Sequence, residues 1–270
     1  MINSLETSSI YGPVESWRLG KSLGVDLLMD PSTCSFNCTY CQLGFIQRIT
    51  TERKVYVPTK KVIEDFKNSD WQSVDVITFS GSGEPTLALN IGEVIREIKK
   101  ITKIPIAILT NGTLFNDDQV RKDILEADVI SVKLDASDDK TLQAINRPAN
   151  KINLKMILSG IEKFKEDILV GACRGKPKLQ IQIMFMPQNK NKIDDLAKLL
   201  NKIKPDEIAL NTPTRPYPGG WDIITRGAHG EDAKKIKFST KPLNKITLEE
   251  AQEIENRLRE LTGLRVVSVY

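Results

Sequence analysis

Three of the four cysteines in this 270-residue chain lie within eight positions of one another. Cys34, Cys38 and Cys41 occupy the segment TCSFNCTYCQLG (33–44) with the spacing Cys-x3-Cys-x2-Cys. Cysteine thiolates bind zinc and iron–sulfur clusters, and they also act as redox-active nucleophiles. The cluster of thiols therefore indicates a metal or redox site near the start of the chain.

Each of these chemistries needs a different set of ligands. A structural zinc ion takes four Cys or His ligands, and only Cys173 and His229 are spare. Neither lies in a paired motif, so we expect Cys173 to be a spare thiol and His229 to be a solvated loop residue. A redox dithiol would use Cys38 and Cys41 and would leave Cys34 idle. A 4Fe–4S cluster normally takes four cysteines, so three would leave one iron open to a ligand from outside the protein.

The segments around this loop alternate between short apolar runs and stretches with helical periodicity. We expect strands at 22–29, 74–80, 104–110, 128–136, 178–186 and 206–212, and helices at 59–69, 87–102, 116–127, 152–167 and 191–203. Strands that alternate with helices form a parallel sheet. Repeated right-handed crossovers give a doubly wound sheet or an open or closed barrel, which periodicity alone does not separate. The fold class is therefore α/β, with the cysteines at the carboxyl end of the first strand, where such folds place their sites.

The regular alternation ends after residue 212, and the following segment is rich in proline, glycine and charge. A helix is expected at 247–263, where Thr247 and Glu250 can form a capping box. We therefore expect one unit over 1–212 and a short C-terminal α/β appendage over 213–270 that is not an independent domain.

Composition constrains the function only weakly. The net charge of +4 and a pI of about 8.7 fall below the range typical of nucleic-acid-binding domains, and the lysines are scattered. The sequence contains no run of about 18 or more apolar residues, the length needed to span a membrane. The first twenty residues also lack the apolar region of a signal peptide. We expect a cytoplasmic protein with no membrane partner.

The cysteine spacing resembles that of the radical S-adenosylmethionine (SAM) superfamily. The resemblance implies a partial (β/α)6 TIM-like barrel in which Cys34, Cys38 and Cys41, in a loop at 31–44, hold one 4Fe–4S cluster. SAM would chelate the open iron. One electron would then cleave SAM to a 5′-deoxyadenosyl radical, which abstracts hydrogen from a substrate. An electron donor of the flavodoxin or ferredoxin type is the partner that this chemistry implies.

Further segments at predicted strand ends are similar to SAM-binding motifs of the same superfamily. FSGSGEPTL (79–87) resembles its Gly-Gly-Glu motif, and LTNGTL, KLDA, INRP and LNTPTRP follow at later strand ends. The cofactor-binding candidates are Tyr40, Gly81, Ser82, Gly83, Glu84, Thr110, Asn111, Lys133, Asp135 and Asn211. The candidates for a catalytic role are Lys133, Asp135, Arg147 and Arg215. A simple tight turn at Asn111 and a mutual charge network between Lys133 and Asp135 are the alternatives.

The longer run from YGPVESWRLGKSLGVDLL (11–28) to LNTPTRP (210–216) resembles one subgroup, the short enzymes related to the wyosine-synthesising tRNA enzymes. This resemblance implies modification of an RNA substrate. The 4-demethylwyosine synthases carry additional cysteines for a second cluster, and only Cys173 remains here, so wyosine formation itself is not expected. The alternatives are radical modification or activation of a protein or peptide, as by a glycyl-radical activase, and a zinc-stabilised binding module without catalysis.

Overall fold

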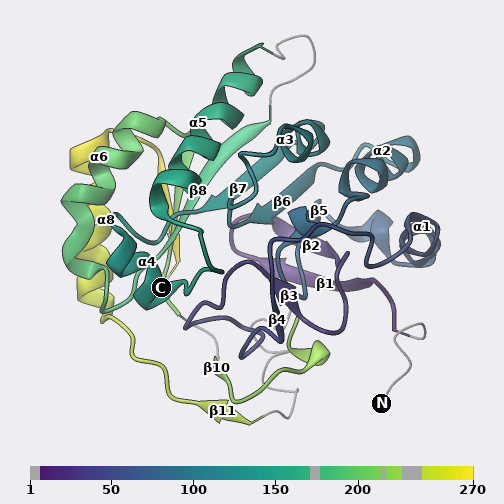
Figure 1. Cartoon of the computed structure of the whole chain (residues 1–270), viewed down its shortest axis with the longest axis horizontal. Coiled ribbons are helices and arrows are strands. Elements are labelled where there is room, and N and C mark those ends of the chain that lie inside the picture. Colours follow the sequence, from purple (N-terminus) through teal and green to yellow (C-terminus); the bar gives the residue numbers. More distant parts are fainter. Residues whose placement is uncertain (1–6, 171–176, 214–216, 227–238, 270) are drawn as a thin grey trace.

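A computed structural model of the chain describes residues 7–170, 177–213, 217–226 and 239–269. Its centre is a curled parallel sheet, shown in Figure 1. Six strands lie side by side in the order β2 (Gly20–Val25), β5 (Val76–Phe79), β6 (Ile106–Thr110), β7 (Val129–Lys133), β8 (Lys178–Met184) and β9 (Glu207–Asn211). They correspond to the six predicted strands, and the predicted α/β partial barrel is confirmed.

One additional strand extends the sheet at each edge. β1 (Ile10–Ser16) pairs antiparallel with β2, and β12 (Val266–Val269) pairs parallel with β9. The sequence reading missed β1. Its pattern is interrupted by Pro13, and its register shifts between Tyr11 and Val14. Proline lacks the donor that a central strand needs, but an edge strand tolerates it.

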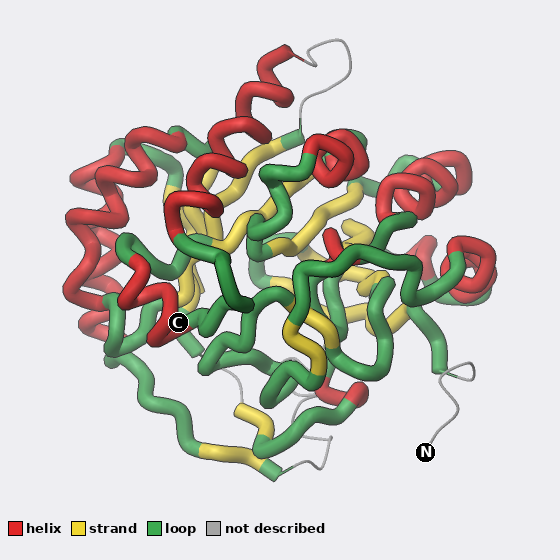
Figure 2. Tube along the Cα trace, viewed as in Figure 1, coloured by secondary structure: helices red, strands yellow, loops and turns green. Residues whose placement is uncertain are grey.

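Helices cover the outer face of the curled sheet, as Figures 1 and 2 show. They are α1 (Thr59–Lys67), α2 (Ile91–Ile101), α3 (Asp118–Ile124), α5 (Leu154–Val170), α6 (Ile193–Ile203) and α8 (Leu248–Thr262). A further short helix, α4 (Asp139–Ile145), lies beside the cysteine loop, whose Thr39 N–H donates to the Ile145 carbonyl at 2.9 Å. Short 3-10 turns occur at Trp71–Ser73, Pro85–Leu87, Lys190–Lys192 and Ile223–Thr225. In α2, for example, Ile91, Val94, Ile95 and Ile98 are all fully buried. This spacing places their side chains on one stripe against the sheet.

Four very short strands lie apart from the main sheet. β3 (Thr33–Cys34) pairs with β4 (Arg48–Ile49), and β10 (Tyr217–Pro218) pairs with β11 (Thr240–Lys241). Both pairs lie on the loop side of the sheet, away from the layer of helices (Figure 1). Within the part of the chain that the structure describes, no helix has both the length and the apolar character needed to cross a membrane.

The C-terminal helix α8 begins with the predicted capping box. The Thr247 hydroxyl accepts a hydrogen bond from the Glu250 N–H at 3.2 Å, and the Glu250 carboxylate accepts one from the Thr247 N–H at 2.8 Å. Gly263 ends the helix with a φ of 64°, which is a left-handed conformation that glycine adopts readily. The helix packs on α6, and the strand that follows it joins the main sheet.

The capping box gives a prediction about stability. We expect Thr247→Ala to lower the free energy of unfolding by about 1 kcal/mol, because the N-terminal N–H groups of α8 lose their acceptor. Urea denaturation followed by circular dichroism measures the change. Thr247→Ser keeps the hydroxyl and should unfold like the wild type; an equal loss in both variants would contradict the role of the cap.

Candidate active site

The three clustered cysteines line a single cavity of about 290 Å³ on the inner side of the sheet. Cys34 ends the short strand β3, and Cys38 and Cys41 follow in the connecting loop. The loop after β5 holds β3 in place. The Thr33 N–H donates to the Ser82 carbonyl at 2.8 Å. The Glu84 N–H donates to the Thr33 carbonyl at 3.1 Å. The backbone thus fixes the first cysteine against the glycine-rich loop.

Two glycines make this close approach possible. Gly83 has a φ of 148°, and a Cβ there would lie 1.6 Å from the Thr33 carbonyl oxygen. Gly81 has a φ of 129°, and its Cβ would lie 2.6 Å from the Asp26 carboxyl carbon. Any side chain at either position would separate the two loops, so glycine is required here by space as well as by φ.

Glu84 joins the ends of β5 and β6. Its buried carboxylate accepts hydrogen bonds from the Thr86 N–H and hydroxyl at 3.1 and 2.6 Å. It also accepts from the Thr110 hydroxyl and the Asn111 N–H, both at 2.7 Å. Burial raises the pKa of Glu84, and these four donors oppose the rise. The carboxylate therefore stabilises the loop that carries it.

Amide groups point at two of the sulfur atoms. Cys34 Sγ accepts from the Phe36 N–H at 3.4 Å and from Asn111 Nδ2 at 3.6 Å, and Cys38 Sγ accepts from Asn146 Nδ2 at 3.4 Å. Such N–H donors stabilise the negatively charged thiolate form of cysteine. Burial raises the pKa of all three thiols, that of Cys38 to about 12. They therefore need a bound cation to become thiolates at neutral pH.

The arrangement of donors separates zinc from an iron–sulfur cluster. Of the Cys and His residues, the described part of the chain contains three cysteines, all at the cavity, and no histidine. A structural zinc ion needs four such ligands around one point, whereas the thiolates around a cubane each bind a different iron. The donor set fits the cluster. Cys173 and His229, the spare candidates for zinc, lie outside the described residues.

Asp135 positions the aromatic ring of Tyr40 at the edge of the cavity. The Tyr40 hydroxyl donates a short hydrogen bond to Asp135 Oδ2, which also accepts from Asn146 Nδ2 at 2.7 Å. Its other oxygen accepts from the Met184 N–H at 2.7 Å. The Lys133 ammonium lies 5.1 Å from the centre of the Tyr40 ring and 3.9 Å from the Asp135 carboxylate. Asp135 thus links the cysteine loop to the ends of β7 and β8.

Most of the candidate residues gather at this cavity. Those that line it together with the cysteines are Tyr40, Gly81, Gly83, Glu84, Thr110, Asn111, Lys133 and Asn211. Ser82 and Asp135 are buried and lie outside its lining, where they bond to other parts of the protein. Arg147 is exposed and also lies outside the lining. Its neighbour Asn146 reaches Cys38 instead, and Arg215 lies outside the described residues.

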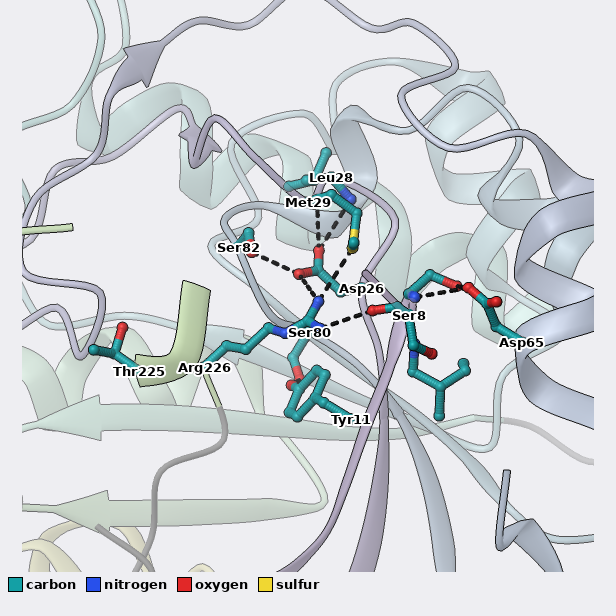
Figure 3. A network of polar contacts seen from close by, with 12 residues as sticks. Ser8, Tyr11, Asp26, Leu28, Met29, Asp65, Ser80, Ser82, Thr225 and Arg226 are labelled. Carbon is teal, nitrogen blue, oxygen red and sulfur yellow. Dashed lines mark hydrogen bonds and ion pairs between the residues drawn. The ribbon is translucent and has the colours of Figure 1, made fainter. Parts of the chain in front are cut away.

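The sequence analysis missed a buried ion pair behind the glycine-rich loop, shown in Figure 3. Asp26 Oδ2 accepts from the Ser82 hydroxyl at 2.6 Å and from Arg226 Nη1 at 3.0 Å. Its Oδ1 accepts from the backbone N–H groups of Leu28 and Met29 at 3.0 and 3.1 Å. Asp26 is the one charged residue in the apolar run LGVDLLM (23–29). A single charge in such a run is the sequence feature that could have indicated a buried, paired carboxylate. No local pattern pointed to Arg226, its partner 200 residues later.

Comparison with known proteins places this chain in a family by its sequence. The radical SAM superfamily profile matches residues 31–200. The UPF0026 protein slr1464 of Synechocystis is 41% identical, covering 94% of this chain and 92% of its own. The UPF0026 protein MJ1312 of Methanocaldococcus jannaschii is 36% identical, covering 80% of this chain and 68% of its own.

Among solved structures, Streptococcus suis SuiB bound to its precursor peptide SuiA aligns with a TM-score of 0.61. Its identity is 16%, and the match covers 88% of this chain and 47% of SuiB, so this chain spans about half the length of that protein. Such a likeness supports the shared barrel fold. The superfamily match includes all three clustered cysteines and most of the strands around them. The chain is therefore an enzyme of the radical SAM superfamily and belongs with the UPF0026 proteins.

Proposed function

We propose that Cys34, Cys38 and Cys41 hold one 4Fe–4S cluster and that SAM binds in the adjoining cavity. The observation that carries the proposal is the convergence of three partly buried thiols, with amide donors to two of them, on one cavity beside a glycine-rich loop. When bound, the cluster supplies the electron that cleaves SAM reductively to a 5′-deoxyadenosyl radical.

The residues of the chain then bind and orient SAM. Gly81 and Gly83 line the cavity, and their close contacts with Asp26 and Thr33 fix the glycine-rich loop beside the cysteines. The Oδ1 atom of Asn211 is buried at the cavity and has no hydrogen-bond partner in the described part of the chain. A buried acceptor of this kind favours a ligand that brings a donor, such as the SAM ammonium or a ribose hydroxyl. Tyr40, fixed by Asp135, provides an aromatic wall beside the cysteines.

For the substrate, we propose RNA, with modification of a tRNA nucleoside as the reaction. The segment that follows the cysteines exposes an aromatic ring, Phe45, which is 48% exposed, together with the side chains of Arg48 and Lys54. Exposed aromatic rings stack on unpaired bases, and nearby cations bind the phosphate backbone. The resemblance of the sequence to the subgroup of tRNA-modifying enzymes agrees with this proposal. A flavodoxin or ferredoxin would supply the electron.

A protein or peptide substrate is the second candidate. The barrel of SuiB, which has been solved with a precursor peptide, aligns over 88% of this chain. A glycyl-radical activase would also need only a compact barrel with a single cluster. A peptide would enter the same cavity, so the two proposals differ in what the exposed segment around Phe45 contacts.

The cluster proposal predicts the effect of removing each ligand. After anaerobic reconstitution with iron and sulfide, we expect the wild type to be brown and to form 5′-deoxyadenosine from SAM with a strong reductant. Cys34→Ala, Cys38→Ala and Cys41→Ala should each reduce product formation to the protein-free background. Cys173→Ala is the matched control and should retain iron content and product. A brown wild-type protein that forms no 5′-deoxyadenosine, or a colourless one that contains zinc, would refute the proposal.

The glycine contact predicts a specific defect in SAM binding. Gly83→Ala places a methyl group against the Thr33 carbonyl, so we expect it to displace β3 and to lose SAM binding in equilibrium dialysis. Gly220→Ala serves as the control, since a Cβ there meets nothing within 4 Å, and it should bind SAM like the wild type. Wild-type SAM affinity in Gly83→Ala would show that SAM does not depend on this loop.

The RNA proposal predicts a missing nucleoside. Mass spectrometry of tRNA from a deletion strain should lack one modified nucleoside that the intact strain contains, and the wild-type gene should restore it. Phe45→Ala should restore less of it, because base stacking on an aromatic ring contributes about 1–3 kcal/mol. Leu169→Ala, which removes an exposed apolar side chain on α5, should restore it fully. An unchanged nucleoside profile on deletion would favour the protein substrate instead.

A further inference from the structure

We propose that Arg18, in the turn between β1 and β2, binds an anionic group, a carboxylate or a phosphate, of the substrate that occupies the barrel. Arg18 lines the same cavity as the three cysteines. The inference rests on the proposed function in one respect, because it assumes that the cluster and SAM fill the end of the cavity near the cysteines.

The guanidinium of Arg18 lacks the partners that such a group requires. Its Nε and Nη1 atoms are buried and have no hydrogen-bond partner among the residues described. Its guanidinium carbon lies 5.3 Å from the centre of the Trp17 ring, which supplies no hydrogen-bond acceptor in the ring plane. Burial lowers the pKa of Arg18 to about 10.

Other buried arginines of the protein show the contrast. Arg53, Arg121 and Arg226 have side chains that are at most 9% exposed, and each pairs with a carboxylate. The N–O distances of these pairs are 2.9 Å, 2.5 Å and 3.0 Å. A buried charge is costly unless it is paired. An unpaired guanidinium at a cavity therefore indicates a ligand that supplies the missing negative charge.

The position of Arg18 excludes the carboxylate of SAM as that partner. Its turn precedes Gly20 at the amino end of β2, whereas the cysteine loop follows the carboxyl end of the same strand. The five residue steps from Gly20 to Val25 span about 16 Å. In the proposed function, SAM would bind beside the cysteines, which lie beyond the carboxyl end of this strand. The anion at Arg18 then belongs to a second, elongated molecule.

Polar side chains line part of the wall between the two ends. The cavity is lined here by Ser22 of β2, Thr78 of β5 and Gln182 of β8. The hydroxyls of Ser22 and Thr78 form a hydrogen bond of 2.7 Å with each other. Hydroxyl and amide groups can hydrogen-bond to a polar ligand along its length, whereas an apolar core would fill this space with Leu or Ile. The structure assigns the inner barrel to a substrate with an anionic end.

The test measures the melting temperature of the full, cluster-loaded chain in chloride buffer, with inorganic phosphate or succinate added at constant ionic strength. The wild type should melt at a higher temperature as one of these anions is added, because a ligand that binds only the folded state stabilises it. Arg18→Met should show no such rise. Without anion it should melt at or above the wild-type temperature, since it removes an unpaired buried charge. Arg18→Lys, which keeps the charge, should retain part of the rise.

Arg96→Met is the matched control, because the Arg96 side chain is 50% exposed, and it should respond to anions like the wild type. A response to phosphate alone identifies a phosphate group, and a response to succinate alone identifies a carboxylate. The proposal is overturned if the wild type responds to neither anion, if Arg18→Met responds as the wild type does, or if Arg18→Met melts at a lower temperature without anion. The melting temperature does not depend on SAM cleavage, so this result and the 5′-deoxyadenosine assay can fail independently.

Discussion

The backbone contact between Thr33 and Gly83 is the constraint on which the site depends. Two hydrogen bonds join the strand that carries the first cysteine to the loop after β5, at a separation that leaves no room for a side chain. The contact fixes a thiol and the glycine-rich loop relative to each other before any ligand binds. A cluster and a small cofactor that must touch each other need such a fixed geometry, because a shift of about 1 Å can be costly for catalysis.

Three buried carboxylates extend this constraint across the sheet. Asp26 connects the turn after β2, the glycine-rich loop and the C-terminal segment. Glu84 connects the ends of β5 and β6, and Asp135 connects Tyr40 to β8. Each accepts several hydrogen bonds within the protein. Such fully satisfied polar networks make loops rigid. The acidic groups nearest the cysteines thus hold the walls of the cavity.

Two residues at the cavity carry buried polar atoms without hydrogen-bond partners among the described residues. Asn211 Oδ1 and the Nε and Nη1 atoms of Arg18 are buried at the cavity and, among the described residues, have no hydrogen-bond partner, in contrast to the carboxylates of Asp26, Glu84 and Asp135. Other buried polar atoms without partners among the described residues, such as Thr39 Oγ1 and Asn90 Oδ1, lie outside the lining of the cavity. Asn211 and Arg18 differ from these because they line a space that is open to a ligand. Because unmet polar groups cost stability, they are expected at sites where binding a ligand compensates for the cost.

The sequence by itself determined the six parallel strands, most of the outer helices, the cap of α8 and the placement of the cysteines at a strand end. These features are local: apolar periodicity, capping residues and ligand spacing act within a few residues. It did not determine β1, whose pattern is broken at Pro13, or the pairing of Asp26 with Arg226, and it singled out Arg147 where Asn146 reaches Cys38. Only the tertiary structure decided which polar side chains found partners and which were left facing the cavity. Pairing across 200 residues depends on how the whole sheet curls, and no local pattern encodes that curvature.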